Sequence, residues 1–140
     1  DYTVKSFATF ISTEFTNREI QNQVRHVDIL PTILEKLQIS VDTNFQNFDG
    51  ISLVPLIEKN KINDIPAYIE TGNPLQENEP PKNPNTKAIR FKDWKLIYNE
   101  YDNSKELYDL QKDPNEKNNL INTGLEIEKL LWQELLKHQV

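Results

Sequence analysis

Few side chains in this sequence have the types and spacing that catalysis requires. The only two histidines are His26 and His138. His26 directly precedes a predicted helix, and His138 lies in the last turn of another, where an imidazolium would complement the negative end of the helix dipole. Neither forms a triad with a nucleophile and an acid, and neither has the helical i, i+4 spacing of zinc ligands. Both are therefore predicted to have structural or surface roles.

The acidic residues offer one tempting pair, Asp109 and Asp113, four positions apart. Asp113 suits the N-cap of a helical turn, and Asp109 stands at the end of a predicted strand, so structural roles are favoured over catalysis or metal binding. A glycine-rich phosphate loop is also excluded, because Gly50, Gly72 and Gly124 lie far apart. The sequence therefore predicts no catalytic residue and no metal ligand.

Three cations form the remaining candidate site. Lys82, Lys87 and Arg90 lie in or just after a proline-rich stretch and could meet an anion, but solvated surface charge is the favoured interpretation of all three. The tryptophans, Trp94 and Trp132, lie within apolar patterns and are interpreted as core residues. From its residues alone, the chain is predicted to be a domain without an active site of its own.

The composition restricts the class of protein. The chain has 140 residues and a net charge of −6, which suits one domain, or a domain with a small appendage. The acidic balance and the lack of a basic run argue against nucleic acid as a partner. No apolar run approaches the length of a membrane span, and no targeting segment is recognisable. Without cysteine there is no disulfide, thiolate metal site or cysteine nucleophile. The first residue is Asp1, which suggests a processed product or a piece of a longer protein.

The N-terminal half predicts elements that need a larger partner. The apolar run Phe7–Ile11 has no alternation, so it predicts a strand buried on both faces. Residues 27–39 have helical spacing of apolar residues, with Asp28 as N-cap. Residues 40–64 are expected to form a loop with a turn at Asp49 and Gly50, followed by a short helical turn over 53–57. The helix has one broad apolar stripe, formed by Ile29, Leu30, Ile33, Leu34 and Leu37.

The C-terminal half predicts an antiparallel meander covered by a helix. Only Lys92 and Asp93 separate the second and third strand candidates, a hairpin-length gap. Residues 72–86 are rich in proline and polar residues, which indicates a lid or a slack loop. A helical turn is expected at 113–116, and an amphipathic helix over 125–140. The strand candidates are 67–70, 87–91, 94–98 and 106–110.

Three segments, in this order, resemble the C-terminal part of the sulfatase family within the alkaline phosphatase superfamily. The resemblance covers residues 24–120 and is specific in order and spacing. It is carried by Val27-Asp28-Ile29-Leu30-Pro31-Thr32-Ile33-Leu34, by Asp49-Gly50-Ile51-Ser52-Leu53-Val54-Pro55-Leu56, and by Ala88-Ile89-Arg90, Trp94-Lys95-Leu96-Ile97, Glu106-Leu107-Tyr108-Asp109-Leu110 and Asp113-Pro114 with Glu116, Asn119 and Leu120.

This resemblance implies hydrolysis of sulfate esters by a formylglycine nucleophile with a bound calcium. The sequence has neither cysteine nor the Ser-x-Pro-x-Arg alternative from which formylglycine is made, so nucleophile and metal cannot be assigned to any residue here. The implied fold is α+β: a small antiparallel four-stranded sheet packed on a C-terminal helix, preceded by a strand and helix that belong to a larger α/β catalytic domain. The expected boundary divides residues 1–64 from residues 65–140.

The leading hypothesis is thus the C-terminal portion of a sulfatase-like hydrolase, inactive alone, with a structural role and a role at the substrate cleft. Its expected partners are the remainder of the catalytic domain and, through the parent, a sulfate ester. Self-association through helix 29–39 is also expected. The alternatives are a non-catalytic protein-interaction module, or a phosphodiesterase or phosphonate hydrolase of the same superfamily. Parents of this family are often exported or periplasmic, and the sequence leaves the compartment open.

Overall fold

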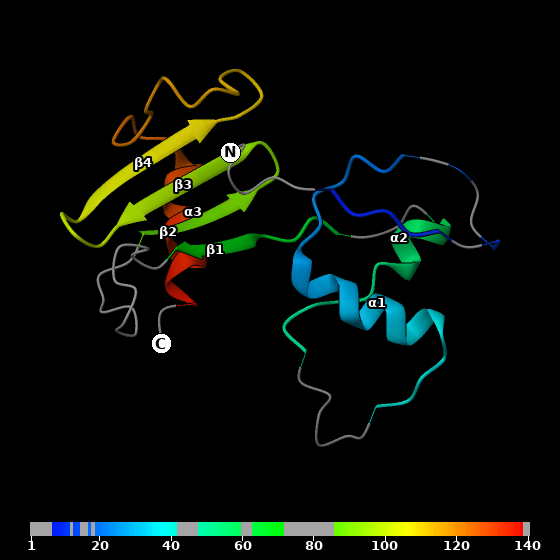
Figure 1. Ribbon diagram of the computed structural model, residues 1–140. Helices are drawn as coiled ribbons and strands as arrows, with labels where there is room; N and C mark the ends of the chain where they lie inside the picture. The colour runs from blue at the N-terminus through cyan, green and yellow to red at the C-terminus, as the bar shows by residue number, and fades with distance from the viewer. Residues whose placement is uncertain are drawn as a thin grey trace, which may run out of the picture. The chain divides into compact units, whose positions relative to one another are not determined.

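The chain forms two compact units, a helical unit and a sheet unit (Figure 1). The structure is a computed structural model and describes residues 7–11, 13–14, 17, 19–41, 48–59, 63–71 and 86–138. The helical unit spans Phe7–Ile65, and the described part of the sheet unit begins at Pro66. No helix within these described ranges has the length and apolar composition of a membrane span.

The helical unit contains a 3-10 turn and two short helices. The turn η1 (His26–Asp28) leads directly into α1 (Ile29–Lys36), and α2 (Val54–Lys59) follows later in the chain. The apolar spacing predicted α1 as far as residue 39, but the helix ends at Lys36. Gln38 adopts a left-handed φ of 54°, and the Ile39 N–H bonds back to the Leu34 carbonyl at 2.9 Å. This is the hydrogen-bonding pattern that closes many helix C-termini.

The predicted strand at Phe7–Ile11 is wrong. These residues form no strand, and the side chains of Phe7 and Ile11 are 92% and 94% exposed. A strand buried on both faces needs neighbouring strands for its backbone groups and covering elements for its side chains. Within the described part of the chain, no strand pairs with this segment. The side chains of Phe7 and Ile11 therefore remain exposed.

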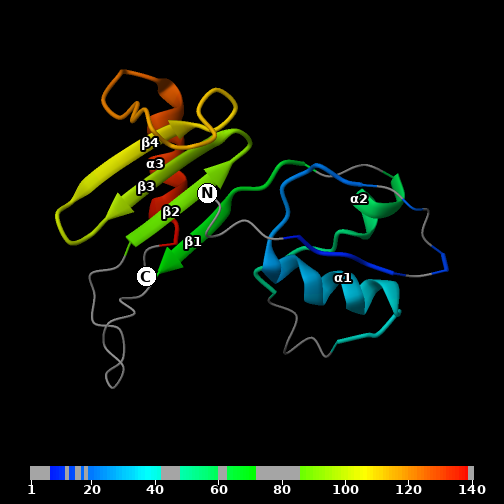
Figure 2. The same ribbon diagram turned by 45° about the horizontal axis from the view of Figure 1, so that its top comes forward.

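The sheet unit is the predicted antiparallel meander, in the strand order β1-β2-β3-β4. All four strand predictions are confirmed to within two residues at either end, and the β2–β3 hairpin turns at Lys92 and Asp93, with Lys92 at a φ of 55°. Both Figure 1 and Figure 2 show the strands side by side in this order. The strands are β1 (Ala67–Thr71), β2 (Thr86–Phe91), β3 (Trp94–Asn99) and β4 (Ser104–Asp109).

The core lies between one face of this sheet and α3 (Glu126–Leu136). Strand register places Ile89, Leu96 and Leu107 in one row across β2, β3 and β4. This row meets Leu131 and Leu135 of α3, and all five side chains are 0% exposed. Because side chains alternate along a strand, every second residue of each strand shares this α3 face. The α+β fold class is therefore confirmed.

The helix predicted over 125–140 is shorter than expected, and its apolar stripe is only partly buried. It ends at Leu136, so His138 lies beyond it. Leu131 and Leu135 are fully buried, but Leu130 is 48% exposed. The two buried leucines lie four residues apart on one helical face, whereas Leu130 is turned away from that line.

The predicted helical turn at 113–116 is a single turn that does not continue as a helix. Glu116 has a left-handed φ of 53°, which is incompatible with a helix. The Asp113 carboxylate accepts hydrogen bonds from the N–H groups of Lys117 and Asn118, both at 2.7 Å. Glu116 instead reaches back to the buried Lys95, whose ammonium lies 3.0 Å from its carboxylate. A tertiary ion pair therefore fixes this loop.

Candidate functional site

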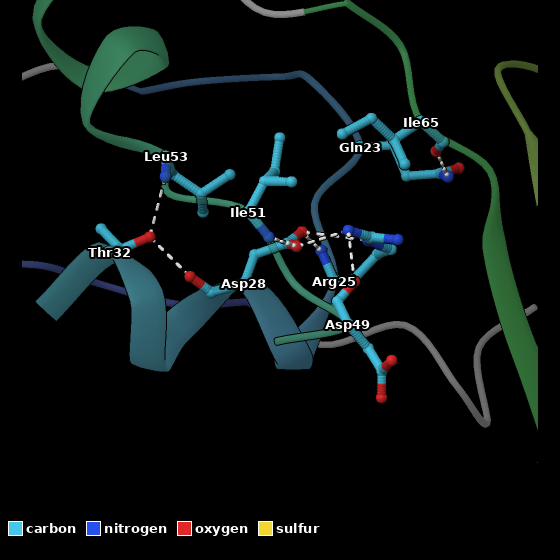
Figure 3. A network of polar contacts seen from close by, with 8 residues as sticks. All are labelled: Gln23, Arg25, Asp28, Thr32, Asp49, Ile51, Leu53 and Ile65. Carbon is cyan, nitrogen blue, oxygen red and sulfur yellow. Dashed lines mark hydrogen bonds and ion pairs between the residues drawn. The ribbon is translucent and has the colours of Figure 1, made fainter. Parts of the chain in front are cut away.

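The most strongly connected polar group of the helical unit is the Asp28 carboxylate (Figure 3). Asp28 is 1% exposed. Its Oδ2 accepts hydrogen bonds from the Arg25 N–H at 2.8 Å and Nε at 3.2 Å. Its Oδ1 accepts from Arg25 Nη2 at 2.7 Å and from the Ile51 N–H at 3.0 Å. Asp28 is the N-cap residue of α1, as predicted, but its side chain makes no capping hydrogen bond to the helix, because its oxygens bind Arg25 and the Ile51 N–H instead.

The charge of Asp28 is stabilised despite its burial. Burial alone would raise the pKa of this carboxyl, but the Arg25 guanidinium and the N–H groups of Ile51 and Arg25 outweigh burial, and the pKa lies below its ordinary value. Two carboxylate oxygens offer about four acceptor directions, and these four donors use them. Asp28 is thus a structural acceptor, with no lone pair left for a metal or a proton-transfer step.

Thr32 makes a second connection between the same two segments. Its hydroxyl donates to the Asp28 carbonyl at 2.5 Å and accepts from the Leu53 N–H at 2.8 Å, as Figure 3 shows. Gly50 allows this close approach, because a Cβ there would lie 1.9 Å from the Val27 carbonyl oxygen. The Asp28–Thr32 and Asp49–Leu53 segments therefore form one packed unit, here called the Asp28 junction. The sequence analysis did not predict this junction, although both of its segments lie within the family motifs Val27–Leu34 and Asp49–Leu56.

The three predicted substrate-binding cations are not brought together. Lys82 lies outside the described residues. Lys87 and Arg90 both lie on β2, but they are three positions apart, so they point to opposite faces of the sheet. The Lys87 ammonium lies 2.7 Å from the Glu100 carboxylate, and this hydrogen bond raises the pKa of Lys87 above its ordinary value.

The remaining titratable candidates have local partners. Asp109 pairs with Lys112 at 3.1 Å and accepts the N–H groups of Gln111 and Lys112. Burial acts to raise the pKa of Asp109, yet these contacts with Lys112 and Gln111 lower it overall. The His138 ring stacks on Tyr68, with centroids 4.6 Å apart. These contacts favour structural roles for both residues.

The described ranges contain no group of three or more His, Asp or Glu residues placed to hold a metal ion. The calcium implied by the family resemblance is therefore assigned to no residue seen here, and no reaction step is derived through it.

The tryptophans contribute to the sheet core. Both pack against the buried cluster. Trp132 meets Tyr98 edge to face at 5.1 Å, and the Lys105 ammonium lies 3.4 Å from the Trp132 ring centroid. These contacts account for the aromatic surface of Trp132 without a ligand.

Comparisons with known proteins place the chain in a family. The family model for the C-terminal region of N-sulphoglucosamine sulphohydrolase matches residues 9–140. Among curated proteins, none matches. Two solved structures are similar to the chain. One is BT4656 in complex with its substrate D-glucosamine-2-N,6-O-disulfate, with 28% identity over 80% of this chain and a TM-score of 0.59. The other is BT1596, a 2-O GAG sulfatase, with 26% identity over 79% of this chain and a TM-score of 0.57.

The chain spans only 23% of the length of each of these two proteins. The matched part of this chain includes all the elements of the sheet unit and the Asp28 junction. The chain therefore belongs to the N-sulphoglucosamine sulphohydrolase C-terminal family, and it corresponds to the C-terminal portion of a sulfatase.

Proposed function

We propose that this chain serves as the C-terminal scaffold of a sulfatase-like hydrolase that cleaves sulfate esters. The observation that carries the proposal is the family match over residues 9–140. Of the two similar structures, BT4656 has D-glucosamine-2-N,6-O-disulfate as its substrate and BT1596 is a 2-O GAG sulfatase, and each is about four times as long as the matched region. The substrate class that they support for the parent of this chain is a sulfated sugar.

In this proposal the chemistry is supplied from outside the chain. The full sequence contains no cysteine and no Ser-x-Pro-x-Arg segment, so formylglycine cannot form on it. Formylglycine and calcium would belong to the rest of the parent. The 140 residues alone are then expected to be inactive.

The scaffold role is supported by the apolar surface of α1. Leu30, Ile33 and Leu37 are 53%, 41% and 63% exposed, although they belong to the helix's apolar stripe. Exposed apolar patches of this kind mark interfaces. We assign this stripe to contact with the remainder of the catalytic domain, in which the apolar segment Phe7–Ile11 would gain neighbouring strands.

The finer part of the proposal concerns Lys82, Lys87 and Arg90 at the border of the substrate cleft. A cation near the cleft would steer an anionic sulfate ester toward it. Lys87 and Arg90 lie on opposite faces of the sheet, so their contributions should be separable. The test makes three single variants of the full-length parent: Lys82→Gln, Lys87→Gln and Arg90→Gln. A variant should lower kcat/KM at low salt if the substituted residue borders the cleft. Unchanged kcat/KM in the triple variant would overturn this part alone.

The main proposal is tested by assaying the purified 140-residue chain with an aryl sulfate and calcium. No turnover above buffer is expected, and the full-length parent, assayed in parallel, should hydrolyse the ester. Turnover by the chain alone would contradict the proposal. So would a parent that lacks sulfatase activity but hydrolyses a phosphodiester, which would favour the related hydrolases of the superfamily.

A further inference from the structure

The outer edge of β4 is occupied by a side chain rather than by another strand. β4 pairs with β3 and ends the sheet. On its other side, the Leu107 N–H donates to Asn119 Oδ1 at 3.0 Å, and the Leu107 carbonyl accepts from the Leu120 N–H at 2.8 Å. Asn119 Nδ2 also lies 3.5 Å from the Lys105 carbonyl. Asn119 and Leu120, here called the strap, therefore take the place of a fifth strand.

The strap has the chemistry that an edge strand requires. The Asn side-chain amide has one acceptor and one donor group, like a peptide unit. Its Oδ1 also accepts from the Ile121 N–H at 3.0 Å, which holds the side chain in position. Exposed edge strands offer unpaired backbone groups to other chains, and proteins usually block them. The strap therefore satisfies the outward groups of Leu107 from within the chain.

The edge beneath the strap is self-complementary. The outward backbone groups belong to Lys105, Leu107 and Asp109, since the Asp109 carbonyl also bonds outside the sheet, to the Asp113 N–H at 2.7 Å. A second copy of β4, laid antiparallel with Leu107 opposite Leu107, can exchange two hydrogen bonds at that pair. The same register sets Lys105 opposite Asp109 of the second copy, and Glu106 opposite Tyr108. Opposite charges in directly facing positions stabilise a pair of strands.

We propose that the strap closes a latent pairing edge, and that opening it allows two copies of the chain to associate through β4 in one two-fold symmetric antiparallel sheet. A two-fold axis at Leu107 gives both copies the same backbone hydrogen bonds and the same charge pairs, as a closed symmetric dimer requires. In the closed form, the Asn119 side chain occupies the Leu107 N–H, and the N–H groups of Leu120 and Asp113 occupy the Leu107 and Asp109 carbonyls, so this association is prevented.

The test compares three forms of the 140-residue chain by sedimentation velocity over a range of concentrations. Asn119→Ala removes the two side-chain hydrogen bonds of the strap and leaves the Leu120 N–H as its remaining bond to Leu107. The loosened strap is expected to open and to give a concentration-dependent dimer. Asn118→Ala is the matched control, because Asn118 uses only its backbone N–H, bonded to Asp113. The control and the unmodified chain should behave alike. Any association through α1 would be the same in all three forms.

Charge and geometry then identify the interface. Adding Lys105→Glu to Asn119→Ala is expected to weaken the dimer about tenfold, since two symmetry-related pairs change from opposite to like charge. The chain has no native cysteine, so Ser104→Cys gives one spin label per copy. In the proposed register, the two labelled backbones lie about 20 Å apart, because they are offset by six residues along the strands.

Several results would overturn the proposal. The first is an Asn119→Ala chain that has a folded sheet by tryptophan fluorescence but associates no more than the Asn118→Ala control. The second is a dimer that Lys105→Glu does not weaken. The third is a distance between the two labels close to the spacing of neighbouring strands. Should Asn119→Ala unfold the sheet, Asn119→Leu replaces it. This variant has nearly the size of Asn but neither the acceptor for Leu107 nor the donor to Lys105, and it should dimerise as Asn119→Ala does. A monomer at all concentrations would again overturn the proposal.

Discussion

The contacts inside the sheet unit differ in kind from those inside the helical unit. In the sheet unit, five apolar side chains from β2, β3, β4 and α3 are fully buried. In α1 of the helical unit, Thr32 is the only buried residue. Asp28, the N-cap residue of α1, is equally buried, and both residues are polar. On the same helix, Leu30 and Ile33 are 53% and 41% exposed. Within the described residues, the sheet unit has a complete core, whereas α1 is positioned mainly by polar contacts.

This difference shows which unit depends on a partner. Burying a large aliphatic side chain contributes about 1.5–3 kcal/mol, and the sheet unit uses its apolar residues in this way. The helical unit buries Leu53, Val54 and Leu56 but leaves three residues of the apolar stripe exposed, namely Leu30, Ile33 and Leu37. Its hydrogen bonds set the local geometry, and an exposed apolar face remains for another surface.

The largest expected effect comes from Gly50→Ala. The added Cβ would meet backbone atoms of Val27 and Asp28 at 1.9–2.8 Å, so the Asp28 junction must open. We expect a loss of about 4 kcal/mol or more from the helical unit. Hydrogen exchange at the Ile51 and Leu53 amides should accelerate, while fluorescence of Trp94 and Trp132, both in the sheet unit, stays unchanged. Retained protection of these amides would contradict the prediction.

Gly124→Ala is the matched control for this change. A Cβ at Gly124 meets no atom within 4 Å, but the residue has a φ of 83°. The expected cost is about 1–2 kcal/mol, which is the strain of a left-handed conformation in a residue with a side chain. It should appear in the urea unfolding of the sheet unit, followed by tryptophan fluorescence.

The next effect contrasts two leucines. Leu96→Ala leaves a cavity in the sheet core and should cost about 2–5 kcal/mol. Leu30, at 53% exposure, should tolerate the same change within about 0.5 kcal/mol in this chain. Urea unfolding measures the first, and hydrogen exchange of the helical unit measures the second. Equal losses would show that the α1 stripe is already covered, and the contrast between the units would fail.

A smaller effect is expected for Asp28→Asn, and it depends on pH. The pKa of Asp28 is lower in the folded chain than its ordinary value of 3.8, so its stabilisation is present above that value and is lost as the pH falls through the lower folded pKa. The variant should cost about 1–3 kcal/mol at neutral pH, and the difference should shrink in acid. Exchange of the Ile51 amide, measured at several pH values, checks this. A pH-independent difference would count against it.

The smallest effect is expected for His138→Ala, which removes the stack on Tyr68. An aromatic pair of this kind contributes about 0.5–1.5 kcal/mol. Urea unfolding with tryptophan fluorescence should detect the loss in the sheet unit. Gln133→Ala, at an exposed position of α3, is the control and should be neutral. If both variants unfold alike, the stack contributes nothing measurable.

The sequence by itself determined the sheet unit and the family. In residues 86–109 the strands are joined by connections of two and four residues, so strand pairing there follows from local pattern and short connections. The ordered motifs from Val27 to Leu120 were sufficient to indicate the sulfatase family, and the family model confirms it. The core row of Ile89, Leu96 and Leu107 follows from the same register.

Only the tertiary structure decided the polar contacts and the fate of the apolar segments. The Phe7–Ile11 run has the composition of a buried strand, but a strand exists only beside another strand. Asp28 has the right type and position for a helix cap, yet its oxygens bind the neighbouring Arg25 and the Ile51 N–H, 23 residues further along the chain, instead of the helix. Asn119 belongs to one of the family motifs, but the sequence gave no sign that its side chain would bond to the edge of β4. A polar side chain binds whichever donor or acceptor the folded backbone brings within about 3 Å, and sequence spacing does not encode that distance.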